Sequence, residues 1–376
     1  MNQDCNYLQK TKFKFIYRKI LFYFASTGLI KKELSPISFI CERENWAIYW
    51  EGIGLSQSIN KNSSTPVMVV THKVHTVRSP IVHFGSQYMW EIWREIIPKH
   101  SKVVVNFFHG KPEDGPEVSK HIDDFLKNYT KIDIIVVSST LIYRRLISWG
   151  VPESKIVKVY IGLDTKIFSF TEAQEKFQVR KALGFKSDEY VIGSFQKDGI
   201  GWGVGTEPKL IKGPDIFVET IRKLSKHINI SVLLTGPARG YVISSLEKLK
   251  IKLVHVNVSQ YVDMPSYYKA LDLYLITSRE EGGPKSLLEA ICSAVPVVST
   301  PVGMAIDLLP GIESCSIADS FEPDELVNRI LKIKYSSKNY ISRSSVDNIK
   351  KQVDFEIVAK EYVKRVYAEI YKEIKN

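Results

Sequence analysis

Cysteine is scarce in this chain of 376 residues: only four are present, and none stands at a disulfide or metal-ligand spacing. Long apolar runs are also lacking near the N-terminus, where residues 20–30 form a run of 11, whereas a membrane-spanning helix needs about 20. No two aspartates are separated by a single residue, so an Asp-x-Asp metal site is missing. No unit of roughly 20 to 50 residues repeats, which excludes a solenoid. These absences favour a globular protein of a reducing cytoplasm.

The composition provides enough apolar material for two globular domains, because 44% of the residues are hydrophobic and 25% are charged. More than half of the net charge of +11 lies in the first 32 residues, which carry seven basic side chains and one acidic residue. The basic residues are Lys10, Lys12, Lys14, Arg18, Lys19, Lys31 and Lys32. Aromatic residues between them favour an anionic membrane surface over nucleic acid as a partner. The alternative is a helix buried against the first domain, with its lysines in solvent.

Short apolar runs alternate with helical patterns along the rest of the chain, which is typical of parallel strands joined by crossover helices. The strands predicted in the first half are residues 45–50, 66–72, 80–85, 102–110 and 132–139, with helices near 55–61, 87–97, 117–128 and 140–149. The strands predicted in the second half are residues 190–195, 230–236, 252–256, 271–278 and 295–300, with helices near 214–227, 240–249, 265–270 and 284–294. The polar stretch 165–189 is expected to connect the two halves.

This rhythm predicts an α/β protein in which two doubly wound, Rossmann-like domains face each other across a cleft. The expected parts are a basic aromatic segment at 1–32, one domain at 33–170, a second at 171–354, and a helix at 355–376 that packs back on the N-terminal domain. Ligands of open parallel sheets bind at the carboxyl ends of the strands. The chemistry is therefore expected in segments that directly follow strands.

A glycine-rich, charged cluster follows the predicted strand 271–278. Pro284 is suited to be the first residue of a helix, and Gly282 and Gly283 leave the backbone uncovered at the N-terminus of that helix. Unpaired N–H groups and the helix dipole favour a diphosphate there. Glu281 precedes the helix, and Glu289 is expected to turn away from the sheet toward a ligand. The alternative is that both carboxylates are simply exposed to solvent.

Glu281 and Glu289 match the E-x7-E signature of retaining glycosyltransferases with the GT-B fold, in particular glycosyltransferase family 4. The chain resembles that family over roughly residues 132–310. The resemblance implies that Glu281 and the backbone of Gly282 and Gly283 contact the donor sugar, and that Glu289 holds the ribose hydroxyls. Pro284 stands where many members have glycine.

The same resemblance assigns further donor-binding residues. Lys212 and Gly213 match the Lys-Gly pair of the diphosphate site, whereas the arginine of that site has no match, and Lys197 or Lys209 is expected to replace it as a point charge. The glycine-rich insertion 198–206 is interpreted as a flap at the cleft.

The N-terminal half supplies the other side of the predicted site. Gly52 and Gly54, after the predicted strand 45–50, resemble the glycine loop that lets the donor approach the backbone. His109 ends the strand 102–108 at the position where family members often place a histidine beside the donor sugar. Lys285, next to Pro284, completes the donor-binding set.

These features predict a retaining glycosyltransferase that moves a hexose from a nucleotide diphosphate sugar to a glycan or lipid-linked acceptor, in cell-envelope polysaccharide synthesis. In this prediction Glu281, His109 and Lys212 are catalytic, 33–170 is the acceptor side and 171–354 the donor side. No metal or other cofactor is expected, because Lys212, the glycine amides and the helix dipole can stabilise the leaving diphosphate.

The expected partners are the donor, the acceptor and an anionic membrane surface, without nucleic acid, and the expected location is the cytoplasmic side of the membrane. Two alternatives remain: a nucleotide-sugar 2-epimerase on the same fold, and a non-catalytic scaffold that binds membrane glycolipid.

Overall fold

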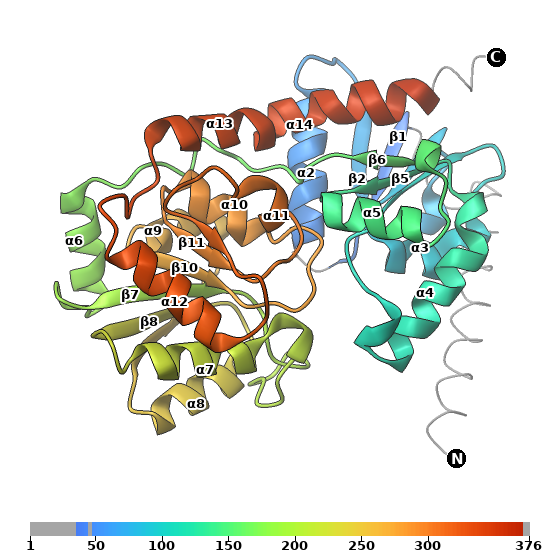
Figure 1. Ribbon diagram of the computed structural model, residues 1–376. Coiled ribbons are helices and arrows are strands. Elements are labelled where there is room, and N and C mark those ends of the chain that lie inside the picture. Colours follow the sequence, from blue (N-terminus) through green and yellow to red (C-terminus); the bar gives the residue numbers. More distant parts are fainter. Residues whose placement is uncertain (1–34, 44–46, 371–376) are drawn as a thin grey trace.

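The apolar runs of the first half form a six-stranded parallel sheet in the computed structural model, which describes residues 35–43 and 47–370 (Figure 1). Its strand order is β2-β1-β3-β4-β5-β6. The strands are β1 (Ile37–Ile40), β2 (Met68–Thr71), β3 (Ile81–Phe84), β4 (Lys102–Asn106), β5 (Ile134–Val137) and β6 (Ile156–Lys158). Strand β1, next to the edge strand β2, pairs with a neighbour on each side, with Ile37 opposite Met68 in β2 and Ile81 in β3.

Helices cover both faces of this sheet. Successive residues of a strand point to opposite faces, so the apolar strands present apolar side chains that must be covered on each side. Ile40 and Phe84 lie in the core under one set of helices. That set is α3 (Gln87–Trp93), α4 (Pro116–Asn128) and α5 (Thr140–Ser148). Phe39 and Ile81 face the other set. The other set is α2 (Ala47–Asn60) and α14 (Phe355–Tyr362).

The second half repeats the architecture with strand order β12-β11-β10-β7-β8-β9. Its strands are β7 (Tyr190–Phe195), β8 (Ile230–Thr235), β9 (Lys252–Val256), β10 (Leu273–Ile276), β11 (Val297–Ser299) and β12 (Ser316–Ile317). Its helices are α6 (Ala173–Ala182), α7 (Pro214–Leu224), α8 (Gly240–Lys248), α9 (Met264–Tyr268), α10 (Lys285–Cys292), α11 (Ala305–Leu308), α12 (Pro323–Lys334) and α13 (Arg343–Val353). The strand order reverses between β7 and β10, which is where such a sheet binds ligands.

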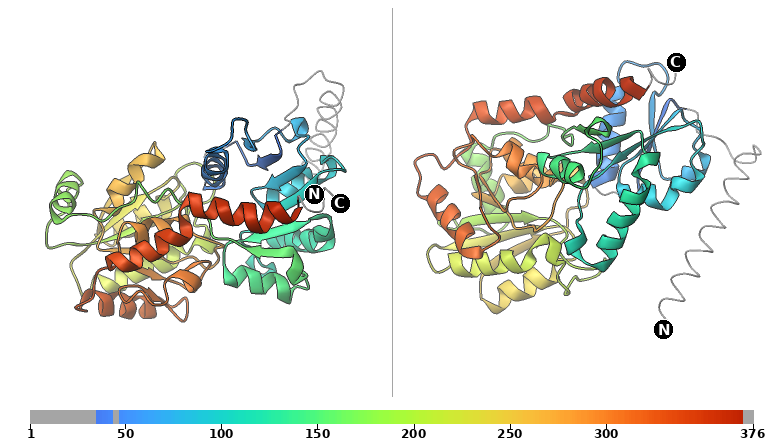
Figure 2. Two further views of the ribbon diagram at one scale, coloured as in Figure 1. Left: turned by 90° about the horizontal axis from the view of Figure 1, so that it is seen from above. Right: turned by 45° about the vertical axis from the view of Figure 1, so that its right-hand side comes forward.

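The chain returns to the first domain at its C-terminal end. Figures 1 and 2 show α13 and α14 running from the second sheet across to the first. A π-helical turn, Val363–Tyr367, follows α14. The Tyr367 hydroxyl lies 2.7 Å from Nδ1 of His83, whose Nε2 lies 2.8 Å from Asn106 Oδ1. Burial lowers the pKa of His83 to about 4, so the ring is neutral at this internal anchor.

The predicted α/β fold with two facing doubly wound domains is confirmed, with local corrections. The strand predicted at 45–50 is wrong for its described residues, 47–50, because α2 begins at Ala47, and the first strand of the described chain lies earlier, at β1. The interpretation failed because Gly52 and Gly54 weaken the helical pattern. The glycine loop predicted at these two residues is wrong for the same reason, since both lie inside α2. A Cβ atom would lie 2.6 Å from Phe39 at Gly52 and 2.2 Å from Phe355 at Gly54, so each glycine admits a ring against the helix. The polar connection 165–189 also contains a helix, α6.

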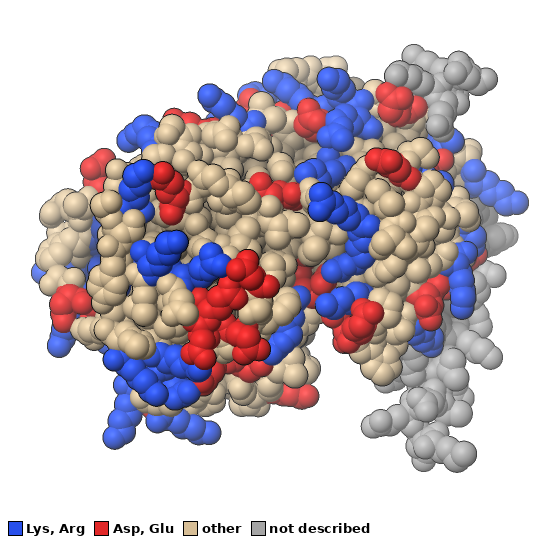
Figure 3. Space-filling view, viewed as in Figure 1, with Lys and Arg blue, Asp and Glu red and all other residues tan. Residues whose placement is uncertain are grey.

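The predictions for residues 1–32 lie outside the described part of the chain. Within the described part, no helix combines the length and the apolar character that a bilayer crossing requires. On the face drawn in Figure 3, basic and acidic side chains are interspersed, with an acidic group near the middle of the view. This face therefore presents no extended surface of a single sign.

Candidate active site

The two segments that follow β7 and β10 bring Lys212 and Glu281 together. Lys212 Nζ lies 2.5 Å from Glu281 Oε1, and the Ser278 hydroxyl donates to the same oxygen at 3.1 Å. Burial alone would raise the pKa of Glu281, but the charge of Lys212 and these hydrogen bonds outweigh it and lower the pKa. Glu281 is thus an ionised carboxylate inside the protein, at the point where the strand order reverses.

Gly213 explains why the Lys-Gly pair is needed here. Its φ is 63°, in the left-handed region that favours glycine, and a Cβ atom would lie 1.8 Å from the Thr277 carbonyl oxygen. The backbone of residues 210–213 is thereby seated on the end of β10, where Arg279 N also donates to Ile211 O at 2.8 Å. This close approach aims Lys212 at Glu281.

Two further lysines, Lys197 and Lys209, are the predicted replacements for the missing arginine. Partial burial and the positive charges of Lys212 and Lys197 lower the pKa of Lys209. Lys197 Nζ lies 4.2 Å from the centre of the Trp202 ring. The structure therefore offers both lysines named as replacements for the missing arginine.

The insertion 198–206 forms a hairpin-like loop with a fixed base. Ile200 N donates to Glu207 O, and Lys209 N donates to Asp198 O. Asp198 is fully buried and pairs with Arg239 at 2.9 Å. The tip of the loop exposes Trp202. The base of the loop is thus held by contacts with the second domain, and the flap stays a prediction for its exposed tip.

The glycines after Glu281 touch the first domain. A Cβ atom at Gly282 would lie 1.8 Å from the Phe108 carbonyl oxygen, and one at Gly283 would lie 2.8 Å from Ser138 Oγ. Pro284 is the N-cap of α10 and not its first helical residue, because its ψ of 115° is extended and the helix begins at Lys285. The two glycines thus let the segment after Glu281 pack directly against the residues that follow β4, and the predicted binding of a diphosphate by their backbone stays a prediction.

His109 lies at the same junction. Gln87, the first residue of α3, holds its backbone: Gln87 Nε2 donates to His109 O at 2.9 Å and Gln87 Oε1 accepts from Phe108 N at 3.2 Å. Burial, and then the charge of Lys212, lower the pKa of His109 to about 4, so the ring is neutral at physiological pH. The structure thus brings Glu281, Lys212 and His109 together, as predicted.

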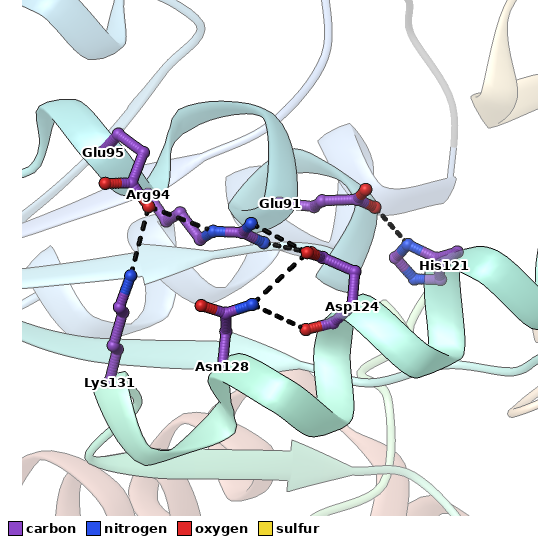
Figure 4. Close-up of polar contacts among 7 residues, drawn as sticks. All are labelled: Glu91, Arg94, Glu95, His121, Asp124, Asn128 and Lys131. Carbon is purple, nitrogen blue, oxygen red and sulfur yellow. Dashed lines mark hydrogen bonds and ion pairs between the residues drawn. The ribbon is translucent and has the colours of Figure 1, made fainter.

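Figure 4 shows polar contacts that hold the segment of α3 and the turn after it against α4. The Tyr88 ring stacks on His121 of α4 with centroids 4.1 Å apart, and His121 pairs with Glu91. Arg94 binds both carboxylate oxygens of Asp124. These contacts hold α3 to α4 and so fix the residue, Gln87, that positions the His109 backbone.

Glu289 is less open than predicted. Its side chain lies between two tyrosines, with Tyr261 OH donating at 2.6 Å and Tyr268 OH donating at 2.7 Å. Burial raises its pKa, although these hydrogen bonds and the charge of Lys285 offset part of that effect. Sequence reasoning missed both tyrosines, which stand seven residues apart just before β10. Each carboxylate oxygen keeps a lone pair for a further donor.

A cavity of about 660 Å³ lies beside these residues, between the two domains. Trp50 and Gly54 line it from α2, and Tyr261 and Lys285 line it from the second domain. The Trp50 and Tyr261 rings are stacked with centroids 5.9 Å apart. The Lys285 side chain is 9% exposed, and its buried ammonium has no hydrogen-bond partner among the described residues. The cavity thus presents an aromatic pair and a buried positive charge.

Glu51 is the acidic neighbour of Lys285, with its Oε2 3.9 Å from Lys285 Nζ. Its carboxylate accepts from Gly162 N at 2.8 Å. Burial raises the pKa of Glu51 to about 7, although Lys285 and the Gly162 hydrogen bond oppose the shift. Sequence reasoning missed Glu51, although a lone glutamate within the apolar pattern of α2 is a signal for a buried polar group.

Glu51→Gln is expected to change how the free energy of unfolding depends on pH. Folded Glu51 stays neutral up to about pH 7, whereas glutamate in the unfolded chain ionises above about pH 4.5. As the pH rises from about 4.5 to about 7, the free energy of unfolding of the wild type therefore falls relative to that of the variant. The loss should reach at most about 3 kcal/mol by pH 8. Urea unfolding at pH 5 and pH 8 measures it.

The matched control is Glu356→Gln, because Glu356 is partly exposed and pairs with Lys61 at the surface. That variant should lack the loss of relative stability between the two pH values. An equal response of wild type and Glu51→Gln to pH would contradict the buried neutral state of Glu51.

The fold and the site together define a class. Two facing doubly wound domains, with paired carboxylates after the strand that follows the topological switch, are the arrangement of the GT-B fold. Residues 204–334 match the family described as "Glycosyl transferases group 1". This part of the chain is therefore a glycosyl transferases group 1 domain.

Two relatives illustrate the similarity of sequence. The lipopolysaccharide core biosynthesis mannosyltransferase LpsB of Rhizobium meliloti is 29% identical over 158 residues, which are 40% of this chain and 42% of that protein. The uncharacterized glycosyltransferase MJ1607 of Methanocaldococcus jannaschii is 23% identical over 251 residues, 65% of this chain and 62% of that protein. Each match spans less than two thirds of the relative.

Solved structures establish the fold. Alr3699/HepE of Anabaena, crystallised with UDP and glucose, has a TM-score of 0.68 and 15% identity, covering 89% of this chain and all of that one. Sucrose-phosphate synthase of Thermosynechococcus elongatus has a TM-score of 0.70 and 13% identity, covering 90% of this chain and all of that one. The predicted GT-B architecture is confirmed over both domains.

Proposed function

We propose that this protein is a glycosyltransferase that moves a hexose from a nucleotide diphosphate sugar to a glycan or lipid-linked acceptor, retaining the anomeric configuration. One observation carries the proposal: the Lys212–Glu281 ion pair lies at the topological switch of the second sheet, beside a neutral His109 from the first domain. The relatives named for lipopolysaccharide core mannosyl transfer support a cell-envelope glycan as the acceptor class.

In this mechanism the leaving group is the nucleoside diphosphate. Positive charge grows on the sugar and negative charge on the departing phosphate, so preorganised charges lower the barrier. Lys212 and the backbone amides at the start of α10 stabilise the phosphate oxygens. The leaving phosphate accepts the proton of the attacking acceptor hydroxyl on the same face of the sugar, which retains the configuration.

Glu281 and His109 bind the sugar in this proposal, and Glu289 binds the ribose. Because Glu281 is ionised, it accepts hydrogen bonds from sugar hydroxyls, and because His109 is neutral, it can donate one without adding a competing positive charge. The cavity beside Lys285 takes the nucleoside end, where the buried ammonium faces an anionic part of the donor. Donor contacts of Gly52, Gly54, Gly282, Gly283, Pro284 and Lys197 stay predictions.

A donor panel tests the function. Purified protein is titrated with UDP-, GDP- and ADP-sugars, and each is then incubated with and without an acceptor glycan, in the presence of chelator or of Mg²⁺. Transfer that needs acceptor and survives chelator is expected. Conversion of the sugar without acceptor would indicate a 2-epimerase, and transfer restored only by metal would contradict the metal-independent mechanism.

Glu289→Ala is expected to weaken nucleoside diphosphate binding by about 1.5 to 3 kcal/mol, the cost of losing a charged hydrogen bond. Tyr261 and Tyr268 lose their acceptor in the same variant, so Glu289→Gln, which keeps an acceptor oxygen, should show a smaller loss. Titration calorimetry with the free diphosphate measures both. Unchanged affinity in Glu289→Ala would contradict the ribose role.

We also propose that the protein works at the cytoplasmic face of a membrane, held by residues 1–32. Their six net positive charges and aromatic side chains support attraction to an anionic leaflet, where each basic residue contributes about 1 kcal/mol. A lipid-linked acceptor would be presented at that surface. Salt-dependent sedimentation with anionic vesicles distinguishes this from a segment buried on the first domain.

A further inference from the structure

Glu280, the neighbour of Glu281, makes a contact between the domains that the proposed mechanism does not use. Its side chain is 2% exposed although it carries a carboxylate. Arg145 of α5, in the first domain, binds both of its oxygens, with Nη2 at 3.0 Å from Oε2. A buried, bidentate arginine–carboxylate pair fixes geometry strongly.

The same pair holds the peptide that follows His109. Gly110 N points to Glu280 Oε1 at 3.4 Å, and Arg145 Nη1 donates to Gly110 O at 3.2 Å. The N–H and C=O of Gly110 are thus both engaged by one ion pair. Gly110 has a φ of 116°, a backbone conformation that favours glycine. Because glycine adopts many other conformations equally well, contacts with Glu280 and Arg145 must hold the backbone in this one.

Two short segments therefore face each other along their length. Gly110 meets Glu280 through these hydrogen bonds, and the Phe108 carbonyl meets Gly282, where a Cβ atom would approach it to 1.8 Å. His109 and Glu281 are the middle residues of the two segments. Any shift of one segment along the other would displace His109 from Glu281.

We propose that Arg145 and Glu280 are a positioning pair that couples contact between the two domains to assembly of the sugar end of the active site. Neither residue needs to touch the substrate. The inference rests on the proposed function for its kinetic consequence, whereas the clamp on Gly110 is a property of the protein itself. It predicts loss of turnover without loss of nucleotide affinity.

The chain provides a matched control on the same helix. Asp307 of α11 accepts from Thr140 N, at the start of α5, at 2.8 Å, and lies 3.7 Å from Lys158. Figure 1 shows α5 and α11 meeting where the two domains join. Asp307→Asn weakens this second contact between the domains without touching Gly110 or Glu281.

The first measurement is hydrogen exchange on the ligand-free protein, in a peptide covering residues 107–111. Arg145→Gln and Glu280→Gln are expected to speed exchange at the amide of Gly110, whereas Asp307→Asn should leave that peptide as in wild type. Unchanged exchange in both clamp variants would overturn the proposal, as would equal acceleration in Asp307→Asn. This readout holds even if the panel above finds no transferase activity.

The second measurement is sugar transfer. Arg145→Gln is expected to lower kcat by about 10- to 100-fold, the scale of a misplacement of about 1 Å, with nucleoside diphosphate affinity nearly unchanged. The unfolding midpoint should fall as well, because the buried Glu280 carboxylate loses its partner, so kcat is measured below the unfolding transition. The exchanged pair Arg145→Glu with Glu280→Arg should recover part of that loss. Wild-type kcat in Arg145→Gln, or losses of kcat and nucleotide affinity in parallel, would overturn the positioning role.

Discussion

Replacing Lys212 by alanine is expected to lower turnover by about 10²- to 10³-fold, the range for losing one preorganised charge that stabilises a leaving group. The structure strengthens the reason, because Lys212 Nζ lies 2.5 Å from Glu281 and the charges of both residues act on the buried His109. Steady-state transfer under saturating donor measures the effect, and circular dichroism verifies the fold.

The Lys212 variant has a second consequence that must be separated from the first. Without its cation, Glu281 is a buried carboxylate whose pKa should rise, because burial is no longer outweighed. The double variant Lys212→Ala with Glu281→Gln removes that charge as well and should remain as slow as the single variant. Lys223→Ala is the matched control, since Lys223 pairs with the exposed Asp324 at the surface. Near-normal turnover in Lys212→Ala would exclude Lys212 from the site.

Glu281→Gln is expected to lower sugar transfer by at least about 10²-fold while changing nucleoside diphosphate affinity by no more than about threefold. The carboxylate is kept ionised by Lys212 and accepts from Ser278, so an amide in its place loses the charge but keeps the size. Parallel kinetic and binding titrations measure the split.

Glu289→Ala is the control, because it should mainly weaken nucleoside diphosphate affinity, whereas Glu281→Gln should mainly slow sugar transfer. Equal losses of transfer and affinity in Glu281→Gln would mean that the two carboxylates have exchanged roles. A Glu281 variant that loses affinity alone would place the nucleoside at that end of the cleft.

Most of the fold could be predicted from the sequence because parallel strands buried on both faces are continuous apolar runs. The strands at 190–195 and 252–256 coincide with β7 and β9. The failure at 45–50 has a specific cause: α2 carries two glycines, demanded by Phe39 and Phe355 from other parts of the chain, and local propensity contains no information about those rings.

The candidate site could be predicted in part for the same reason. Glu281 and His109 could be predicted because each comes shortly after a strand, and the carboxyl ends of parallel strands gather at one edge, whereas Lys212 was predicted from its resemblance to the Lys-Gly pair of the diphosphate site. Glu51, Tyr261 and Tyr268 were missed, because their roles depend on partners that only folding brings near.

The sequence by itself determined the class of fold and the positions of the charged loops, since apolar periodicity and glycine spacing are local properties. The tertiary structure alone decided that Glu281 is ionised, that His109 is neutral and that Glu289 lies beneath two tyrosines. Protonation and hydrogen-bond partners depend on burial and on charges brought together from distant segments. The Arg145–Glu280 pair also depends on the tertiary structure. Its two residues are 135 positions apart, and only contact between the two domains brings both of them to Gly110.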